Sequence, residues 1–179
     1  MTRRHTLLPV AAAALSLFVI DAPASVATPA TPAAGVVSEN GYGALRVGMT
    51  WAQAHAVMPS LRRETSEESE TCFTARSRSL SGVYLLFEGG HLGRVSVEQS
   101  SRIATARGIR VGSTLAQVRA AYGPRLVQEA HAYEGPQAVY LTYWTVPRRS
   151  GIRFETDTHR RVATIHGGNA TIEYVEGCS

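Results

Sequence analysis

The sequence GIRVGSTLAQVRAAYGP at residues 108–124 repeats an earlier stretch, ALRVGMTWAQAHAVMP, at residues 44–59. A shift of 64 residues aligns seven identical positions in the two copies. These positions are Arg46, Val47, Gly48, Thr50, Ala52, Gln53 and Ala56 in the first copy and Arg110, Val111, Gly112, Thr114, Ala116, Gln117 and Ala120 in the second. An internal repeat constrains the whole architecture, so it is interpreted before any single element.

Each copy predicts a short helix that begins at a capping box. Thr50 is followed three residues later by Gln53, and Thr114 is followed in the same way by Gln117. In this motif the threonine oxygen accepts a hydrogen bond from a helical N–H group, and the glutamine bonds back to the cap. Apolar residues then recur every three to four positions until a proline. A helix of about two turns is marginal alone, so we expect each to pack on a sheet.

Strands are predicted after each helix, in the same order. One strand covers residues 72–76 in the first copy and another covers residues 139–146 in the second. Further matches follow at a shift of 67 residues. They pair Phe87 and Glu88 with Phe154 and Glu155, and Arg94 and Val95 with Arg161 and Val162. A last strand is predicted at residues 171–175, where residue types alternate. The predicted fold class is α+β, with two tandem repeats that each pack a short capped helix on an antiparallel sheet.

The N-terminus reads as an export signal. Residues 1–27 combine a basic start at Arg3 and Arg4, an apolar segment and small residues before a cleavage site near Ala27. Residues 28–40 are rich in Pro, Ala and Thr, which predicts a spacer. Repeat 1 then covers residues 41–100, and repeat 2 covers residues 101–179. We expect an exported protein, periplasmic or secreted, and the sequence allows either Sec or twin-arginine export.

The two cysteines, Cys72 and Cys178, predict one disulfide. An exported chain with an even number of cysteines normally pairs them. This bond would tie repeat 1 to the C-terminus and close the fold. A bridged cysteine has no thiolate, so neither residue is assigned a catalytic role.

Composition argues against several function classes. The formal net charge is +4, and no nucleic-acid-binding motif accompanies it. All 18 basic residues other than histidine are arginine. The acidic residues between 64 and 71 predict a solvated loop. The histidines lack the spacing of a zinc site, and no nucleophile motif or phosphate-binding loop is present. We therefore expect no cofactor, no metal and no enzymatic activity.

One catalytic alternative remains open. Glu88 and Glu155 occupy matching places in the aligned repeats. If they met near a symmetry axis about 5–10 Å apart, the two carboxylates could carry out hydrolysis. This alternative describes a small secreted hydrolase.

The repeated motif resembles a known family. The RVGMT stretch with its following glutamine is similar to the helix opening of the BamE (SmpA/OmlA) outer-membrane lipoproteins, and the strands at 140–144 and 152–165 resemble that family's sheet. Two such units in tandem resemble the β-lactamase inhibitor protein superfamily. The resemblance implies helices on one sheet face and a second face free for proteins. The chain lacks the lipid-attachment cysteine of the lipoproteins, so no stable membrane anchor is expected.

These observations predict an exported, non-enzymatic binding protein that acts through a sheet surface. The expected partner is a protein of the cell envelope or the extracellular space, so the protein is an envelope scaffold or an extracellular inhibitor. Tyr140 and Trp144 are the predicted aromatic anchors, and Arg148 and Arg149 are the predicted charged rim. Aromatic and arginine side chains dominate the energetics of many interfaces.

Overall fold

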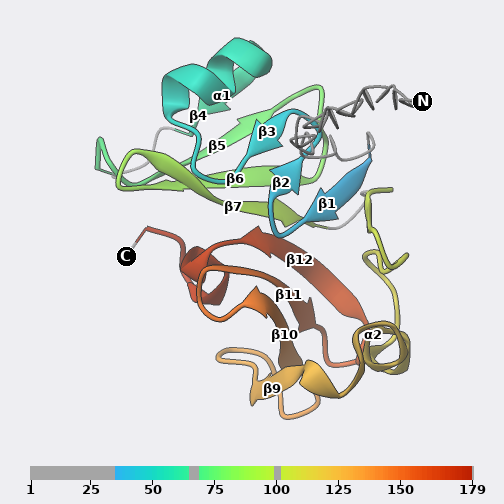
Figure 1. Ribbon diagram of the computed structural model, residues 1–179. Helices are drawn as coiled ribbons and strands as arrows, with labels where there is room; N and C mark the ends of the chain where they lie inside the picture. Colours follow the sequence, from blue (N-terminus) through green and yellow to red (C-terminus); the bar gives the residue numbers. More distant parts are fainter. Residues whose placement is uncertain (1–34, 65–68, 99–101, 179) are drawn as a thin grey trace, which may run out of the picture.

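The computed structural model describes residues 35–64, 69–98 and 102–178, and most of its strands form one large antiparallel sheet. The sheet has eight strands in the order β4-β5-β6-β7-β12-β11-β10-β9 (Figure 1). The strands are β4 (Leu61–Arg63), β5 (Phe73–Ser77), β6 (Val83–Glu88), β7 (His91–Val97), β9 (Val127–Ala130), β10 (Val139–Val146), β11 (Ser150–Thr156) and β12 (Val162–Gly168). Strands β7 and β12 pair at the centre and join the N-terminal half of the sheet to the C-terminal half. The predicted α+β class is confirmed.

A smaller sheet packs against the large one. Its order is β3-β2-β1-β8, with β1 (Val36–Ser38), β2 (Gly41–Tyr42), β3 (Leu45–Arg46) and β8 (Ala104–Thr105). Strand β1 lies within the region that we had predicted to be spacer. It comes so close to β12 that a Cβ atom on Gly167 would stand 2.2 Å from the carbonyl oxygen of Ser38. Only glycine fits there.

Both helices begin as predicted. Helix α1 (Trp51–Val57) and helix α2 (Leu115–Tyr122) each carry a complete capping box. The Gln53 N–H donates to the Thr50 Oγ1 at 3.3 Å, and the Gln117 N–H donates to the Thr114 Oγ1 at 3.2 Å. Each cap satisfies one of the N–H groups that a helix start leaves without a partner.

The two helix starts are attached to the sheet by the same backbone bonds. The Gly48 N–H donates to the Leu92 carbonyl at 2.7 Å, and the Gly112 N–H donates to the Val162 carbonyl at 2.7 Å. The reciprocal bonds run from Leu92 to Met49 and from Val162 to Ser113. Both segments therefore approach the start of a central strand, β7 in one half and β12 in the other.

These bonds correct the predicted strand alignment. We had matched Val95 with Val162, but the residue bonded like Val162 is Leu92. The strand partner of Leu92 is Phe87, and the strand partner of Val162 is Thr156. Thr156 therefore corresponds to Phe87. The predicted match, Phe154, lies two residues earlier. Both hairpins contain a register irregularity just before these pairs, but the connection from Thr156 to Val162 is one residue longer than that from Phe87 to Leu92.

Aromatic side chains pack beneath each helix. In the first half, Trp51 contacts the stacked rings of Phe73 and Phe87, whose centroids lie 4.7 Å apart. In the second half, Tyr122 packs edge-on against Tyr143 and Phe154, at centroid distances of 5.2 and 5.0 Å. All of these side chains share one apolar core with residues of both helices. We call this surface of the large sheet the helix face and the opposite surface the second face.

The C-terminal segment differs from the prediction. Residues 170–173 form the 3-10 helix η2 (Ala170–Glu173) and not a strand, because the Asn169 side chain accepts a hydrogen bond from the Thr171 N–H and turns the chain. The Arg94 guanidinium then donates to the carbonyl oxygens of Thr171 and Tyr174, at 3.0 and 2.8 Å. The segment therefore lies against β7.

The predicted disulfide between Cys72 and Cys178 is confirmed. It fixes the end of the C-terminal segment near β5, across a sequence separation of 106 residues. The predicted signal peptide, most of the predicted spacer and residues 65–68 of the acidic stretch lie outside the described residues.

Candidate functional site

The predicted anchors Tyr140 and Trp144 both point to the second face. Along β10 they alternate with Leu141 and Tyr143, which belong to the core of the helix face. Tyr140 is 3% exposed, so its ring offers almost no surface to a partner as the protein stands. Trp144 is half-buried and lies next to Gly151. The structure thus settles which face each residue occupies, which strand alternation alone left open.

The predicted rim arginines lie in the turn between β10 and β11, and both are exposed. Arg148 adopts a left-handed backbone conformation with a φ of 54°. Its guanidinium lies 3.4 Å from the Glu173 carboxylate of η2. That ion pair is largely exposed on the arginine side and contributes little to stability. Arg149 takes part in no ion pair among the described residues.

Tyr140 and Arg148 meet in a cavity of about 320 Å³ on the second face. The cavity lies between the last strands of the sheet and the C-terminal segment. Its lining residues are Glu129, Ala130, Tyr140, Arg148, Arg153, Glu173 and Val175. Trp144 and Arg149 are not among them. The structure therefore brings two of the four predicted site residues together and adds others that the sequence did not indicate.

Arg153 is the central charged group of this cavity. Its guanidinium carbon lies 3.9 Å from the centroid of the Tyr140 ring, and its Nη1 donates to Glu129 at 3.1 Å and to Thr142 at 3.2 Å. The Arg153 side chain is 5% exposed, whereas the Glu129 side chain is 54% exposed. A buried cation that stacks on an aromatic ring is held in a fixed orientation. The Glu129 carboxylate, in contrast, is exposed, so water or a ligand can replace it at Arg153.

A chain of hydrogen bonds at the centre of the sheet reaches this cavity through His131. The Ser96 hydroxyl lies 2.8 Å from the His166 Nδ1, and the His166 Nε2 lies 3.0 Å from the Glu155 carboxylate. His131 stacks on Tyr140 with a centroid distance of 4.4 Å, and its Nε2 lies 3.8 Å from the same carboxylate. The chain connects β7, β12 and β11 to the floor of the cavity.

Burial sets the charge states of this chain. It lowers the pKa of His166 and outweighs the hydrogen bond to Glu155, so the imidazole is neutral near pH 7. Burial alone would raise the pKa of Glu155, but the hydrogen bond from His166 and the neighbouring cationic groups hold it below its ordinary value. In the consistent tautomer, the His166 Nε2–H donates to Glu155, and Nδ1 accepts a hydrogen bond from the Ser96 hydroxyl.

Ser96, His166 and Glu155 are arranged like the nucleophile, base and acid of a hydrolase. The burial of the serine and the histidine gives them a structural role here. Ser96 and His166 are 4% and 6% exposed, so a substrate cannot reach the hydroxyl in this conformation. These hydrogen bonds instead fix the Glu155 carboxylate beside His131 and below Tyr140. The hydrogen bond from His166 offsets the cost of partly burying the Glu155 charge.

The two glutamates of the hydrolase alternative do not meet. Strands β7 and β12 lie between β6, which carries Glu88, and β11, which carries Glu155. Three strand spacings correspond to about 14 Å, beyond the separation at which two carboxylates share a glycosidic bond. Glu88 accepts a hydrogen bond from the Tyr174 hydroxyl at 2.6 Å and so holds the C-terminal segment.

Sequence reasoning missed Arg153, His166 and Ser96. Each lies on a strand at a position that alternates with core residues, so a polar second face was visible in the pattern. Their meeting was not visible, because it depends on the pairing of β7 with β12 between the two halves. Within residues 35–64, 69–98 and 102–178, no three His, Cys, Asp or Glu side chains are grouped as ligands of one metal ion.

Comparison with known proteins finds no matching protein family, no similar curated protein and no similar solved structure. In the described part of the chain, neither helix has the length and apolar character needed to cross a bilayer.

Proposed function

We propose that this chain is an exported binding protein that captures a protein partner on the second face of its large sheet. The proposal includes signal-peptide cleavage near Ala27, action in the periplasm or outside the cell, and an origin from two tandem BamE-like repeats. The partner is a protein of the envelope or the extracellular space, and the activity is non-enzymatic.

The observation that carries the proposal is the preorganised Arg153–Tyr140 pair at the floor of the second-face cavity. Binding is favoured when charged groups are already desolvated and oriented in the free protein, because less freedom is lost on association. Arg153 has these properties, and its exposed partner Glu129 can be exchanged. An aspartate or glutamate of the partner can replace the Glu129 carboxylate and bond to the same guanidinium.

The surrounding groups support a protein over a small ligand. Trp144 supplies half-buried aromatic surface on the same strand, and Arg148 with Arg149 adds exposed positive charge at the β10–β11 turn. Aromatic anchors beside a charged rim are typical of protein interfaces. The disulfide and the Arg94 bonds hold the C-terminal segment at one side of this surface, so the surface is rigid.

The test is capture of partners from periplasmic and culture-medium fractions, followed by affinity measurement on the captured protein. Replacing Arg153 with Met keeps an apolar side chain on Tyr140 but removes the charge, and Trp144→Ala removes the exposed aromatic surface. Each change is expected to cost about 2 kcal/mol or more of binding free energy. Arg148→Ala is expected to slow association and to weaken its dependence on salt.

Two controls separate the alternatives. Arg110→Ala changes an exposed arginine that does not line the cavity and should leave capture intact. Glu88→Gln and Glu155→Gln address the hydrolase alternative. If these glutamine variants abolish a measurable turnover while Arg153→Met and Trp144→Ala still capture the partner with unchanged affinity, the binding proposal is wrong.

A further inference from the structure

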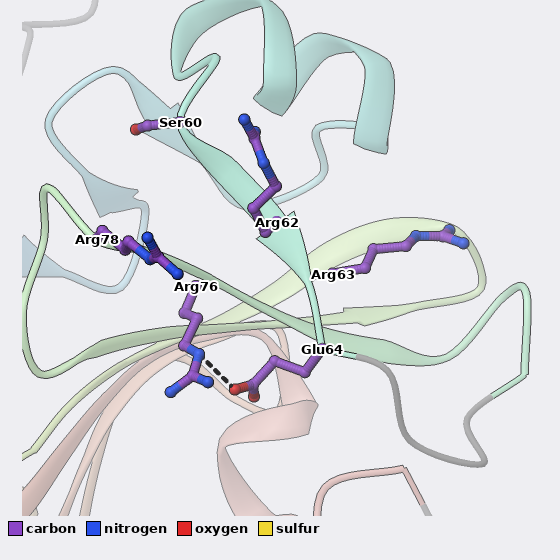
Figure 2. Close-up of a pocket in the computed structure, with 6 residues that line it drawn as sticks. All are labelled: Ser60, Arg62, Arg63, Glu64, Arg76 and Arg78. Atoms are coloured by element: carbon purple, nitrogen blue, oxygen red, sulfur yellow. Dashed lines mark ion pairs between the residues drawn. The ribbon is translucent and has the colours of Figure 1, made fainter.

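A second hollow lies at the opposite edge of the large sheet, far from the partner cavity in strand order. It has a volume of about 700 Å³ and is formed where β4 and β5 meet. Its lining residues are Ser60, Arg62, Arg63, Glu64, Arg76 and Arg78 (Figure 2). We call it the arginine groove. Four of its six residues are arginines, and one is acidic.

The strand register concentrates positive charge here. Arg62 on β4 lies directly opposite Arg76 on β5. Like charges at directly opposed positions destabilise a strand pair. Glu64 offsets part of this repulsion, because its carboxylate lies 2.8 Å from the Arg76 Nε. The Arg76 side chain is 62% exposed, so this ion pair is weak and open to competition.

Much of the hydrogen-bonding capacity of the groove is unused. Among the described residues, the two Nη atoms of Arg76 and the whole guanidinium of Arg78 have no hydrogen-bond partner. Arg62 is held in place by bonds from its Nη1 to the Pro59 and Leu61 carbonyls, at 2.9 and 2.7 Å. Arg63 extends away from the others and lies over the Phe73 ring (Figure 2). Arg62 points toward α1, away from the Arg76 guanidinium (Figure 2), so Arg76 and Arg78 are the cations that a ligand would meet.

Hydroxyl groups lie beside these arginines. The Ser60 Oγ is 2.7 Å from the Ser77 Oγ and 3.0 Å from the Ser79 Oγ, and the last two are 2.7 Å apart. Serine hydroxyls rotate freely and can turn a proton toward an incoming acceptor. Ser60 and Ser79 are exposed, and Ser60 lines the groove itself.

The donors of the groove match an anionic acceptor with several oxygen atoms. A carboxylate has two oxygens and satisfies one guanidinium fork, whereas a phosphate or sulfate group presents three. The groove volume lies in the usual range for pockets that bind small organic molecules, so it can hold the body of an ester as well as its anionic group.

We propose that the arginine groove binds a phosphate or sulfate monoester, with Arg76 and Arg78 contacting the oxyanion. Glu64 is displaced from Arg76 or rotates toward Thr74, from which it already accepts a hydrogen bond at 3.0 Å. The site is independent of the partner surface, because the two share no lining residue.

Calorimetric titration of the purified protein, with its disulfide intact, tests this site. The probes are glucose 6-phosphate, glucose 6-sulfate and glucuronate, which pair similar sugars with a phosphate, a sulfate or a carboxylate. At least one of the two tetrahedral esters is expected to bind with one-to-one stoichiometry, and glucuronate at least tenfold more weakly. The ester that binds more tightly shows whether the groove prefers a phosphate or a sulfate group. Phosphate binding should strengthen between pH 5.5 and 7.5, since the second phosphate pKa is near 6, and sulfate binding should not change.

Variants locate the binding. Arg78→Gln and Arg76→Gln are each expected to raise the dissociation constant about tenfold. Arg110→Gln, which removes an exposed arginine outside the groove, should change it less than twofold. Arg78 has no side-chain partner among the described residues, so its loss should not disturb folding, which circular dichroism can verify. The proposal is overturned if neither ester saturates, if glucuronate binds equally well, or if Arg78→Gln and Arg110→Gln have the same effect.

Discussion

The half of the large sheet from β4 to β7 and the half from β9 to β12 resemble each other on the helix face and differ on the second face. On the helix face, both halves place a capped helix over buried aromatic rings. On the second face, the C-terminal half buries Arg153 and His166, whereas the N-terminal half buries Arg94 on its central strand but exposes Arg62 and Arg76 near its edge. The helix face must close a core, which restricts its residues, while the second face is free to carry different charges.

The aromatic rings under the two helices provide the largest test of this comparison. Phe87 and Phe154 are both fully buried. Phe87→Ala and Phe154→Ala should each lower the free energy of unfolding by about 3–5 kcal/mol, because both leave a cavity under a helix. Urea denaturation measures the loss, and Phe→Leu at each position should cost less. If one of the two alanine variants loses less than about 1 kcal/mol, the aromatic rings under the two helices do not contribute equally to stability.

The disulfide joins the two halves, so its removal tests how far they depend on each other. The double variant Cys72→Ala with Cys178→Ala should be less stable by about 2–5 kcal/mol, because the unfolded chain regains the freedom that a closed loop of this length removes. Thermal unfolding with and without reductant gives the comparison. Wild type with reductant should approach the variant. Equal stability of all samples would show that Arg94 and Glu88 alone hold the C-terminal segment.

The buried histidine distinguishes the second face of the C-terminal half by its response to pH. The pKa of His166 is lowered in the folded state, so the unfolded chain binds the proton first as the pH falls below about 6.5. Stability should therefore decrease between pH 6.5 and 5, by at most about 1.4 kcal/mol per pH unit. The lowered pKa of Glu155 acts only below its ordinary value of 4.5, outside this window.

Denaturation midpoints measured at several pH values follow this effect. His166→Gln should flatten the dependence between pH 6.5 and 5, even though the variant is less stable overall. The raised pKa of Glu98 opposes this effect near pH 5, so the two profiles are compared with each other. Equal pH dependence in the wild type and in His166→Gln would contradict the assignment of a neutral, buried imidazole.

The helix caps give the smallest expected effect and the closest match between the halves. Thr50→Ala and Thr114→Ala each remove a side-chain bond to a helical N–H group and should cost about 0.5–2 kcal/mol. Thr→Ser at the same positions keeps the hydroxyl and should restore most of the loss. Unequal costs would indicate that one helix is held mainly by its aromatic contacts.

The sequence by itself determined the local structure and the covalent framework. A capping box joins atoms only three residues apart, so it does not depend on the tertiary fold. The pairs Thr50 with Gln53 and Thr114 with Gln117 therefore marked the two helix starts. The range of β10 agreed with the prediction, because β10 has the apolar and β-branched composition of a strand. Cys72 and Cys178 offered a single intramolecular pairing. The sequence also showed that every basic residue other than histidine is arginine. It did not show that four of these arginines lie together in a groove.

Tertiary structure alone decided the register and the sites. The match of Phe87 to Phe154 was two residues out of register, because sequence identity does not reveal which residues pair between strands. The predicted strand at 171–175 became η2 because Asn169 turns the chain and Arg94 binds the carbonyl groups of this segment. Ser96 and His166 meet because β7 pairs with β12 across a separation of about 70 residues, a contact that local propensities do not encode.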